Sequence, residues 1–442
     1  MKRTYIEDLK KHIDKSVIIF GWVNVRRDHG KLIFLDVRDK TGIVQTVLLP
    51  KHKSIHEVGN ELRPEWVIEI HGRVHKRPDE MVNEDTPLGD IEIEVTEIIV
   101  LSRAYELPFD KDSEMNLDTY LDHLPLTLRT SKSRAIFKVQ MVIMAAFREF
   151  LAKEGFIEFQ SPKIIGQDAE GGASVFDVAY FKTTAHLAQS PQFYKQIMVG
   201  VYEKVFTTGN VFRAEKHSTT RHLNEYTSLD IEMGFIEDHN DVMELTSKLM
   251  RHIAGSVKKN CKDELTMFDI ADVKVPNKIP DIKLRKAQKI IGEMYEEECS
   301  NEPDLSPQHE RWISDYALEK YNSDFIFITH YPSEKRPMYI YDDPKDPGYT
   351  RSFDLLFRGI EINTGGQRIH DYDALVQKMK DKGLDPKQFE FYLQAFKYGM
   401  PPHGGFGMGL ERLTAKFLGL MNIKEATLFP RELNRIDTLL SE

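Results

Sequence analysis

The segment that most restricts the possible folds of this chain is PHGGFGMGLERL at residues 402–413. Its four glycines permit backbone conformations and close approaches that a side chain would block. We expect them to make a bend, followed by a helix that begins near Gly409 and carries Arg412 in its first turn. Backbone N–H groups at a helix start, together with one fixed guanidinium, can hold a nucleotide. Glycine-rich turns before helices are usually structural, so this segment does not by itself establish a nucleotide site.

The composition is typical of a globular protein with more than one domain. The chain has 442 residues, 41% of them hydrophobic and 29% charged, and a chain of this length is expected to form two or three domains. No apolar run reaches the roughly 20 residues that a membrane span needs. The first residues lack the apolar core of a signal peptide. We therefore expect a cytoplasmic protein that has no membrane segment.

Cysteine content and charge exclude further classes of protein. Cys261 and Cys299 have no Cys-x-x-Cys spacing, so neither a zinc site nor a disulfide framework is expected, and a reducing compartment fits. The net charge of −10 argues against a protein that binds nucleic acid with its whole surface. Any contact with RNA must therefore come from local basic patches.

The first hundred residues are predicted to form short strands separated by turn residues such as Asp28-His29-Gly30. The strands, rich in Val, Ile and Phe, are expected at residues 16–25, 31–38, 43–49, 66–74 and 91–101. Five strands in about a hundred residues fit a small closed barrel, and the OB-fold is the commonest such barrel that binds oligonucleotides. A β-barrel without a ligand is the alternative.

Residues 105–130 contain Pro108 and Pro125 and no clear periodicity, so we interpret them as a hinge. A long amphipathic helix is predicted at 131–154, ended by Gly155 and followed by a strand that runs into Pro162. The predicted organisation is an OB-fold domain at 1–104, the hinge at 105–130, and a second domain at 131–442.

The second domain is predicted to belong to the α+β class. Strands are expected at 205–213, 226–236, 325–331 and 353–364, and helices at 192–203, 240–258, 373–382 and 386–396. Irregular spacing between strands, several of which form hairpins, favours a mostly antiparallel sheet flanked by helices. Residues 260–324 are expected to form a helical excursion from this sheet.

Arg213 and Glu215 are two residues apart on a predicted strand, so we expect them to face the same side. A guanidinium can clamp an α-phosphate in a fixed fork and stabilise the charge that develops there. An Arg–Glu pair on a sheet surface is the alternative. The polar loop at 216–221, followed by a return strand through Asp230, favours the phosphate clamp.

Asp354 and Glu361 are predicted to meet across a hairpin whose two-residue turn is Arg358-Gly359. Pairing Phe357 with Ile360 sets Asp354 opposite Asn363, which makes Asp354 and Glu361 diagonal neighbours on one face. Two carboxylates this close repel each other unless a cation or proton intervenes, and Mg²⁺ bound to ATP phosphates could supply the cation. An exposed acidic hairpin is the alternative.

Gln192 and Lys195 are three residues apart on a predicted helix and share one face, which by itself is typical of a solvated surface. Arg368 is a second cation just beyond the carboxylate hairpin. Together, the two cations could hold a carboxylate in a substrate side chain by charge-assisted bonds, and Asp230 would balance the local positive charge.

The sequence resembles the class II aminoacyl-tRNA synthetases over nearly its whole length. The helix–strand–proline unit at 131–162 resembles motif 1, residues 211–225 resemble motif 2, and residues 402–413 resemble motif 3. The match is closest to the aspartyl members, of the archaeal and eukaryotic type at 190–196, 358–362, 365–368 and 399–405. Residues 21–28 and 32–34 instead resemble the bacterial type, whose large inserted domain has no room here.

The resemblance implies an active site for ATP, aspartate and Mg²⁺. Arg213 is expected at the substrate carboxylate and α-phosphate, Arg221 at the γ-phosphate, and Tyr226 and Arg412 on the two faces of adenine, with Tyr226 replacing the more common Phe. The implied ATP-binding residues are Arg213, Glu215, Arg221, His222, Leu223, Tyr226, Glu361, Gly409 and Arg412. The implied aspartate-binding residues are Glu170, Gln192, Lys195, Arg213, Asp230, Thr364 and Arg368, and the implied metal ligands are Asp354, Glu361 and Thr364.

For the barrel, the resemblance implies binding of a tRNA anticodon. Phe34 is expected to stack on an anticodon base, with Arg27, Gln45 and Glu92 reading its neighbours, although alternation alone fits a core position for Phe34 equally well. Motif 1 implies a homodimer.

The expected reaction is activation of L-aspartate with ATP·Mg²⁺ and transfer to tRNA, catalysed by positioning and charge stabilisation through Arg213 and Arg412. The alternatives are an enzyme that also charges asparagine tRNA, an asparaginyl enzyme, a non-catalytic RNA-binding paralogue and an amide-forming ligase.

Overall fold

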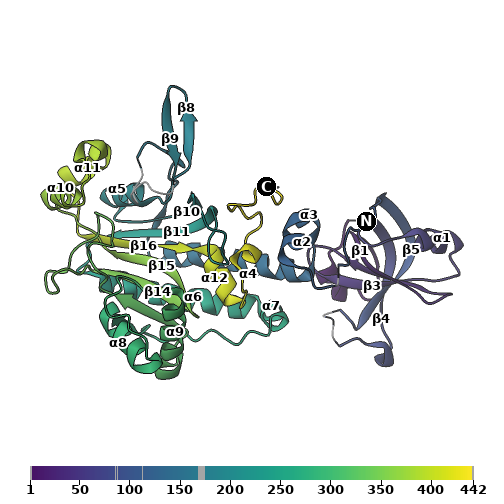
Figure 1. The fold of residues 1–442 in the computed structure, drawn as a ribbon. Coiled ribbons are helices and arrows are strands. Elements are labelled where there is room, and N and C mark those ends of the chain that lie inside the picture. The colour runs from purple at the N-terminus through teal and green to yellow at the C-terminus, as the bar shows by residue number, and fades with distance from the viewer. Residues whose placement is uncertain (1, 85, 87, 112, 168–174, 441–442) are drawn as a thin grey trace. The chain divides into compact units, whose positions relative to one another are not determined.

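The computed structural model describes the chain except residues 1, 85, 87, 112, 168–174 and 441–442. The chain divides into two compact units, Met1–Ser113 and Glu114–Glu442 (Figure 1). The segment predicted to be a hinge carries two short helices, α2 (Leu117–Asp122) and α3 (Leu124–Thr127).

The first unit is a closed five-stranded barrel, as predicted, and its strand order is β1-β2-β3-β5-β4. The strands are β1 (Ser16–Asp28), β2 (Ile33–Arg38), β3 (Ile43–Leu48), β4 (Val67–Lys76) and β5 (Ile91–Ser102), with η1 (Ile6–His12), α1 (Lys53–Glu61) and η2 (Asp79–Met81) between or before them. Alternate residues such as Ile33, Leu35 and Val37 fill the barrel, because side chains on a strand alternate between its faces.

The second unit is built on an eight-stranded sheet with the order β12-β13-β14-β15-β16-β11-β10-β6. The strands are β6 (Ile157–Glu158), β10 (Lys204–Phe212), β11 (Glu225–Gly234), β12 (Asp281–Lys283), β13 (Phe325–Thr329), β14 (Ser352–Phe357), β15 (Ile360–Gln367) and β16 (His403–Gly409). Neighbouring strands are antiparallel except at the two ends, where β12 pairs with β13 and β6 with β10 in parallel. The mostly antiparallel α+β sheet is therefore confirmed.

Helices cover both faces of this sheet. The largest core lies between one face and the helices α4 (Ser131–Lys153), α6 (His239–Asn260) and α12 (Leu410–Phe417). On the other face, α5 (Gln192–Tyr202), α10 (Tyr372–Asp381) and α11 (Glu390–Lys397) pack near β10, while α8 (Leu284–Tyr295) and α9 (Pro307–Tyr321) pack on β13 and β14. The strands between these two groups of helices form the floor of the candidate site.

The glycine-rich stretch is a strand and not the predicted bend. β16 lies in the middle of the sheet, between β15 and β11. A Cβ atom at Gly405 would lie 2.1 Å from the carbonyl oxygen of Ile231 and 2.3 Å from a carboxylate oxygen of Glu232. The glycine is therefore needed for close approach of neighbouring groups. The predicted helix does begin here, at Leu410, with Gly409 as its N-cap and Arg412 in its first turn.

The predicted turn at Arg358-Gly359 is confirmed, because both residues have positive φ angles, of 46° and 82°, and Phe357 pairs with Ile360. The pairing beyond it differs from the prediction. A bulge shifts the register between Leu355 and Leu356, so that Asp354 lies opposite Thr364 and not opposite Asn363. A β-bulge places two residues of one strand opposite one residue of its partner, and it changes which side chains meet.

Other elements depart from the prediction more modestly. Residues 260–324 contain α7 (Lys262–Met267), α8 and α9, as the predicted helical excursion requires, and they also add β12 to the sheet. The helix predicted at 386–396 is divided into η3 (Pro386–Phe389) and α11, and η4 (Ile423–Ala426) follows α12. A small sheet of β7 (Ile164–Ile165), β9 (Thr183–Leu187) and β8 (Asp177–Tyr180) was not predicted. Within the described part of the chain, no helix is both long and apolar enough to cross a membrane.

Candidate active site

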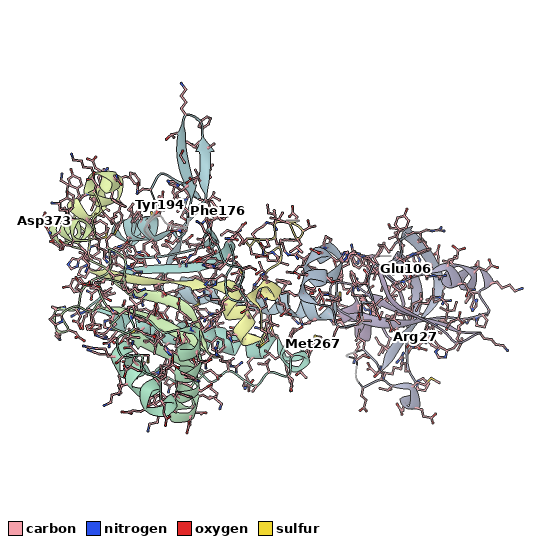
Figure 2. The ribbon with its side chains drawn as sticks, viewed as in Figure 1. Arg27, Glu106, Phe176, Tyr194, Met267 and Asp373 are labelled. Atoms are coloured by element: carbon pink, nitrogen blue, oxygen red, sulfur yellow. The ribbon has the colours of Figure 1, made fainter. Side chains whose placement is uncertain are left out.

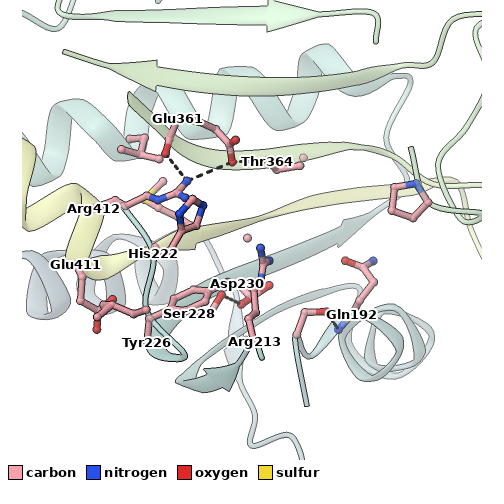
Figure 3. Close-up of a pocket in the computed structure, with 18 of the residues that line it drawn as sticks. Gln192, Arg213, His222, Tyr226, Ser228, Asp230, Glu361, Thr364, Glu411 and Arg412 are labelled. Atoms are coloured by element: carbon pink, nitrogen blue, oxygen red, sulfur yellow. Dashed lines mark hydrogen bonds and ion pairs between the residues drawn. The ribbon is translucent and has the colours of Figure 1, made fainter. Parts of the chain in front are cut away.

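A pocket of about 420 Å³ lies over β11, β15 and β16, with walls from α5, α12 and residues 335–340 (Figure 3). Fourteen of the predicted site residues line it, namely Gln192, Lys195, Arg213, Glu215, Arg221, His222, Leu223, Tyr226, Asp230, Glu361, Thr364, Arg368, Gly409 and Arg412. Asp354 does not line it, and Glu170 lies outside the described residues. Segments more than 200 residues apart in the sequence therefore form one cavity.

Strands β11 and β16 form the floor of this pocket, and their side chains alternate between the pocket face and the core face of the sheet. Leu229 and Ile231 of β11 are buried in the large core, so Asp230 and Glu232 lie on the opposite face. The glycines of β16 pair with these acids, Gly407 with Asp230 and Gly405 with Glu232. Because a glycine has no side chain, each acid has room beside it for a cationic partner.

Two buried ion pairs occupy that room. Lys195 Nζ donates hydrogen bonds of 2.9 Å to Asp230 Oδ1 and to the carbonyl oxygen of Phe406. Arg368 Nε donates to Glu232 Oε1 at 2.9 Å, and its Nη2 donates to Glu232 Oε2 at 3.3 Å. Lys195 Nζ also lies 3.7 Å from Glu232 Oε2, so the two pairs form one network.

The prediction that Asp230 balances the local positive charge fits the Lys195–Asp230 pair, and the network adds a second counter-charge. Glu232 is this second counter-charge, and its side chain has no solvent exposure. Burial disfavours its charged form, but Arg368 and Lys195 outweigh burial and lower the pKa of Glu232. The four side chains are therefore two cations with two anions, rather than two cations with one.

Arg213 and Glu215 follow β10 and are not on a strand as predicted, because β10 ends at Phe212. The Asn224 side chain holds this loop by donating from Nδ2 to the carbonyl oxygens of Arg213 at 2.7 Å and Glu215 at 3.2 Å. The Arg213 guanidinium carbon lies 5.5 Å from the centre of the Tyr226 ring. Both residues still line the pocket.

Arg412 connects two walls of the pocket. Its Nη1 donates to the carbonyl oxygen of Glu361 at 2.9 Å and its Nη2 to that of Arg221 at 3.4 Å. Figure 3 shows Arg412 and His222 close to Glu361, with Tyr226 beside Glu411.

Two titratable groups of the pocket have shifted pKa values. Burial lowers the pKa of His222, and the positive charge of Arg412 lowers it further. Burial raises the pKa of Glu411 to about 7, although its carboxylate accepts hydrogen bonds from the Thr227 backbone.

The predicted metal ligands are close, but they have protein partners in this structure. Asp354 Oδ2 accepts a hydrogen bond of 2.7 Å from Arg336, while Asp354 Oδ1 is buried and has no hydrogen-bond partner. Burial raises the pKa of Asp354 to about 6, and the charge of Glu361 adds to this effect. Glu361 Oε1 accepts a hydrogen bond of 2.9 Å from the Thr364 hydroxyl. Among the described residues, no three His, Cys, Asp or Glu side chains are grouped so that they could hold a metal ion.

The sequence interpretation did not identify Arg336, Lys335 or Glu310 as site residues. Lys335 and Arg336 line the pocket from the loop after β13, and Glu310 forms an ion pair with Arg221. Burial raises the pKa of Glu310 to about 7, with Arg221 opposing this rise. The neighbouring cations Lys335 and Arg336 were the only feature of the sequence that could have indicated this part of the site. Their positions in the sequence do not connect them with any other predicted site residue.

Comparison with known proteins assigns the family. Residues 116–433 match the family described as tRNA synthetases class II (D, K and N), and residues 17–101 match the OB-fold nucleic acid binding domain. The chain belongs to the class II aminoacyl-tRNA synthetases. Members of this family are ATP-dependent ligases, so the chain is a ligase.

Full-length relatives support this assignment to the class II synthetases. The aspartate–tRNA(Asp/Asn) ligase of Thermus thermophilus is 42% identical over 98% of this chain and 99% of its own. The aspartate–tRNA(Asp) ligase of Pyrococcus horikoshii is 42% identical over 99% of this chain and 100% of its own. The asparaginyl-tRNA synthetase of P. horikoshii, solved with asparaginyl-adenylate, has a TM-score of 0.91 at 32% identity over 99% of both chains. The fold alone therefore does not separate aspartyl from asparaginyl synthetases.

In the OB-fold barrel of this synthetase, three of the four predicted anticodon residues belong to one hydrogen-bonded row. Arg27 binds Asp36 through two hydrogen bonds of 2.7 Å and donates to Gln45 at 3.2 Å. Gln45 donates to Glu92 at 3.0 Å. Figure 2 marks Arg27 on the barrel.

Phe34, the fourth of these residues, pairs with Arg27 across β1 and β2. It is partly exposed and lies outside the barrel core that contains Ile33 and Leu35. Its ring meets that of His29 edge to face, with 5.6 Å between the centroids. The core alternative for Phe34 is therefore wrong, and the residue lies on the outer surface of the barrel.

Proposed function

We propose that the chain is an aspartate–tRNA ligase, which forms aspartyl-adenylate from L-aspartate and ATP and transfers the aspartyl group to tRNA. The observation that carries this proposal is that Lys195 and Arg368 line the same pocket as Arg213 and Arg412. Asp230 and Glu232 hold these two cationic side chains in place, and their N–H donors could bind a side-chain carboxylate by charge-assisted hydrogen bonds. The relatives from T. thermophilus and P. horikoshii are named aspartate–tRNA ligases, which supports the same substrate.

In this proposal the residues of the chain act by binding and orientation. Tyr226 and Arg412 would enclose adenine, and the Arg213 guanidinium would hold the amino-acid carboxylate against the α-phosphate. An oxygen of that carboxylate attacks the α-phosphorus, and pyrophosphate leaves. A ribose hydroxyl of tRNA then attacks the aspartyl carbonyl, and AMP leaves. Arg213 would stabilise the negative charge that develops on the α-phosphate oxygens.

The carboxylates near the pocket fit Mg²⁺ carried with ATP. Asp354 Oδ1 is a buried oxygen without a hydrogen-bond partner, and such an atom is costly unless it meets a cation or a donor. Asp354, Glu361 and the Thr364 hydroxyl are the residues that would hold the ion, all through oxygen atoms, which Mg²⁺ prefers. The ion would neutralise charge on the ATP phosphates.

ATP–pyrophosphate exchange, measured separately with aspartate, asparagine, glutamate and lysine, tests the proposed amino acid. We expect exchange with aspartate and at least about tenfold weaker exchange with asparagine, because the NH2 group of a side-chain amide would face the N–H donors of Lys195 and Arg368 instead of accepting from them. Equal exchange with asparagine would contradict the aspartyl assignment and favour an asparaginyl enzyme. No exchange with any amino acid would favour the non-catalytic paralogue.

A second candidate function is charging of both aspartate and asparagine tRNAs with aspartate. It is favoured by three relatives at 41–43% identity that are named aspartate–tRNA(Asp/Asn) ligases, from T. thermophilus, Deinococcus radiodurans and Aeropyrum pernix. Aminoacylation of the two tRNA transcripts, which differ in their anticodons, separates the candidates. Charging of aspartate tRNA alone would exclude the wider function.

We also propose the predicted organisation, with an anticodon-binding domain at 1–104, a hinge at 105–130 and a catalytic domain at 131–442 that forms a homodimer in the cytoplasm, where tRNA charging serves protein synthesis. Exposed apolar side chains on contacting elements support the dimer. Met141 of α4 is 60% exposed and Ile157 of β6 is 46% exposed. Sedimentation of the purified chain tests this, and a monomer at micromolar concentration would contradict it.

A further inference from the structure

Glu310 is a buried carboxylate beside the active site that none of the predicted roles uses. It lies in the first turn of α9, whose start is fixed by a capping box between Ser306 and His309. Its residue exposure is 8%, so the carboxylate is held among protein groups rather than in solvent.

One oxygen of Glu310 joins two segments of the active site. Glu310 Oε2 forms an ion pair with Arg221 Nη2 and accepts a hydrogen bond of 3.2 Å from the backbone N–H of Glu361. Arg221 is carried by the loop between β10 and β11, and Glu361 by the β14–β15 hairpin. Glu310 therefore fixes the loop and the hairpin to the same helix.

Arg412 connects the same two residues from a different helix, since it donates to the carbonyl oxygens of both Glu361 and Arg221. Arg221 and Glu361 are thus bridged twice, by a cation from α12 and by an anion from α9. The anionic bridge contacts the guanidinium of Arg221 itself. The contact with Glu310, and not the contact with Arg412, therefore determines the direction of the Arg221 side chain.

Glu310 also provides a negative charge within a group of cations. Burial and then the charges of Arg221 and Arg311 lower the pKa of Lys416, and Glu310 opposes this lowering. A cation in such surroundings is repelled by its neighbours unless a carboxylate holds it in place. Removing Glu310 would leave Arg221 without this constraint.

We propose that Glu310 is a positioning residue for ATP, which orients Arg221 toward the triphosphate and fixes the hairpin that carries Glu361. The proposal rests on the proposed function, because Arg221 and Glu361 meet a triphosphate only in an ATP-dependent enzyme. A guanidinium has five N–H donors, so an ion pair with Glu310 leaves donors for a phosphate. An arginine that is oriented before ATP binds loses less side-chain entropy on binding.

Steady-state ATP–pyrophosphate exchange on the full chain tests this role, with KM measured separately for ATP and aspartate. We expect Glu310→Ala to raise the KM for ATP about tenfold and to change the KM for aspartate by less than about twofold. Glu310→Gln should fall between wild type and Glu310→Ala, because its amide oxygen still accepts hydrogen bonds but carries no charge. Glu319→Ala is the matched control, since Glu319 is exposed on the same helix and should leave both KM values unchanged.

A double-mutant cycle shows whether Glu310 acts through Arg221. In an Arg221→Ala background, Glu310→Ala should raise the KM for ATP by much less than about tenfold further, because only the contact with the Glu361 backbone is left to lose. The full tenfold effect in that background would overturn the proposal. Equal rises in both KM values together with a lowered melting temperature would also overturn it, since a purely structural role predicts that pattern.

Two further outcomes separate this inference from the proposed function. If wild type shows no exchange with aspartate, the proposed function fails. If wild type is active and Glu310→Ala has an unchanged KM for ATP, only the role of Glu310 fails. Should Glu310→Ala not fold, Glu310→Gln carries the test, and an unchanged KM for ATP in that folded variant would overturn the proposal.

Discussion

Lys195 Nζ lies 2.9 Å from Asp230 Oδ1, and both side chains are almost fully enclosed, with exposures of 2% and 3%. The ion pair joins α5 to β11 at the floor of the pocket. The Asp230 carboxylate fixes the position of the buried Lys195 side chain. The pair therefore contributes both to the fold and to the proposed recognition of aspartate.

Replacing Lys195 with Met should separate these two contributions. We expect aspartate activation to fall at least about tenfold while the KM for ATP changes little, because a lost charged partner in a buried site costs about 2–5 kcal/mol. Unfolding should also require less urea, because the buried Asp230 carboxylate loses its cationic partner. The double variant Lys195→Met/Asp230→Asn should recover stability but not aspartate activation. Recovery of both would show that Lys195 does not read the substrate, and Arg368→Leu tests the second cation by the same assay.

Replacing Glu361 with Gln should weaken the metal dependence of activation. The side chain keeps an oxygen for the Thr364 hydroxyl, which donates at 2.9 Å, but it loses the charge that Mg²⁺ requires. We expect the Mg²⁺ concentration for half-maximal exchange to rise at least about tenfold, with an unchanged melting temperature. Near-normal exchange at ordinary Mg²⁺ would contradict the metal assignment.

Replacing Gly405 with Ala should destabilise the sheet. The added Cβ would lie 2.1 Å from the Ile231 carbonyl oxygen, so two neighbouring strands must separate. Such overpacking costs about 1–3 kcal/mol in the free energy of unfolding, measured by urea denaturation. Gly255→Ala in α6 is the matched control, because nothing lies within 4 Å of its added Cβ and alanine favours a helix. Equal stability of the two variants would contradict close packing at Gly405.

Replacing Phe34 with Ala should weaken tRNA binding and leave aspartate activation without tRNA intact. One lost stacking contact corresponds to about 1–3 kcal/mol in the free energy of binding, measured by filter binding. The melting temperature should stay within a degree or two of wild type, because Phe34 lies outside the barrel core. Leu35→Ala is the contrasting control, because Leu35 is fully buried and its loss costs about 2–5 kcal/mol of stability. Unchanged tRNA affinity in Phe34→Ala would exclude stacking.

His403 should make the stability of the protein depend on pH. Its Nδ1 donates to the Pro401 carbonyl oxygen at 2.8 Å, and its Nε2 accepts from the Gln196 side chain at 2.9 Å, so the native imidazole is neutral. Burial lowers the pKa of His403 to about 4, against about 6.5 in the unfolded chain. Between these values only the unfolded state takes up the proton, so acid reduces the free energy of unfolding.

His403→Gln isolates this contribution from the other titrating groups. At pH 7 the wild type should be the more stable protein, and its advantage should shrink by about 1.4 kcal/mol for each unit that the pH falls between 6.5 and 4. Urea denaturation of both proteins across this range measures the difference. A constant difference would show that native His403 takes up a proton as easily as the unfolded chain.

Local patterns in the sequence were sufficient to predict those strands, helices and turns that are determined by residues close together in the chain. The five barrel strands follow from runs of β-branched residues between turns, and the α12 start follows from the glycine before Leu410. The turn at Arg358-Gly359 was predictable because Gly359 readily accepts a positive φ angle, and Arg358 has one as well. The site residues came from motif resemblance, and Lys195, Arg213 and Arg412 do line one pocket.

Only the tertiary structure decided how those residues are partnered. The bulge that moves Asp354 opposite Thr364 depends on how β14 and β15 pack within the sheet, and period-two reasoning cannot detect an extra residue. The pair of Arg368 with Glu232 spans 136 residues, and the contact of Glu310 with the Glu361 backbone spans 51. The sequence by itself therefore determined which chemical groups the chain offers and on which elements they lie. The sheet decided the charge balance of the site, because it brings charged residues together that are far apart in the sequence. Their separation along the chain does not indicate which of them will form ion pairs.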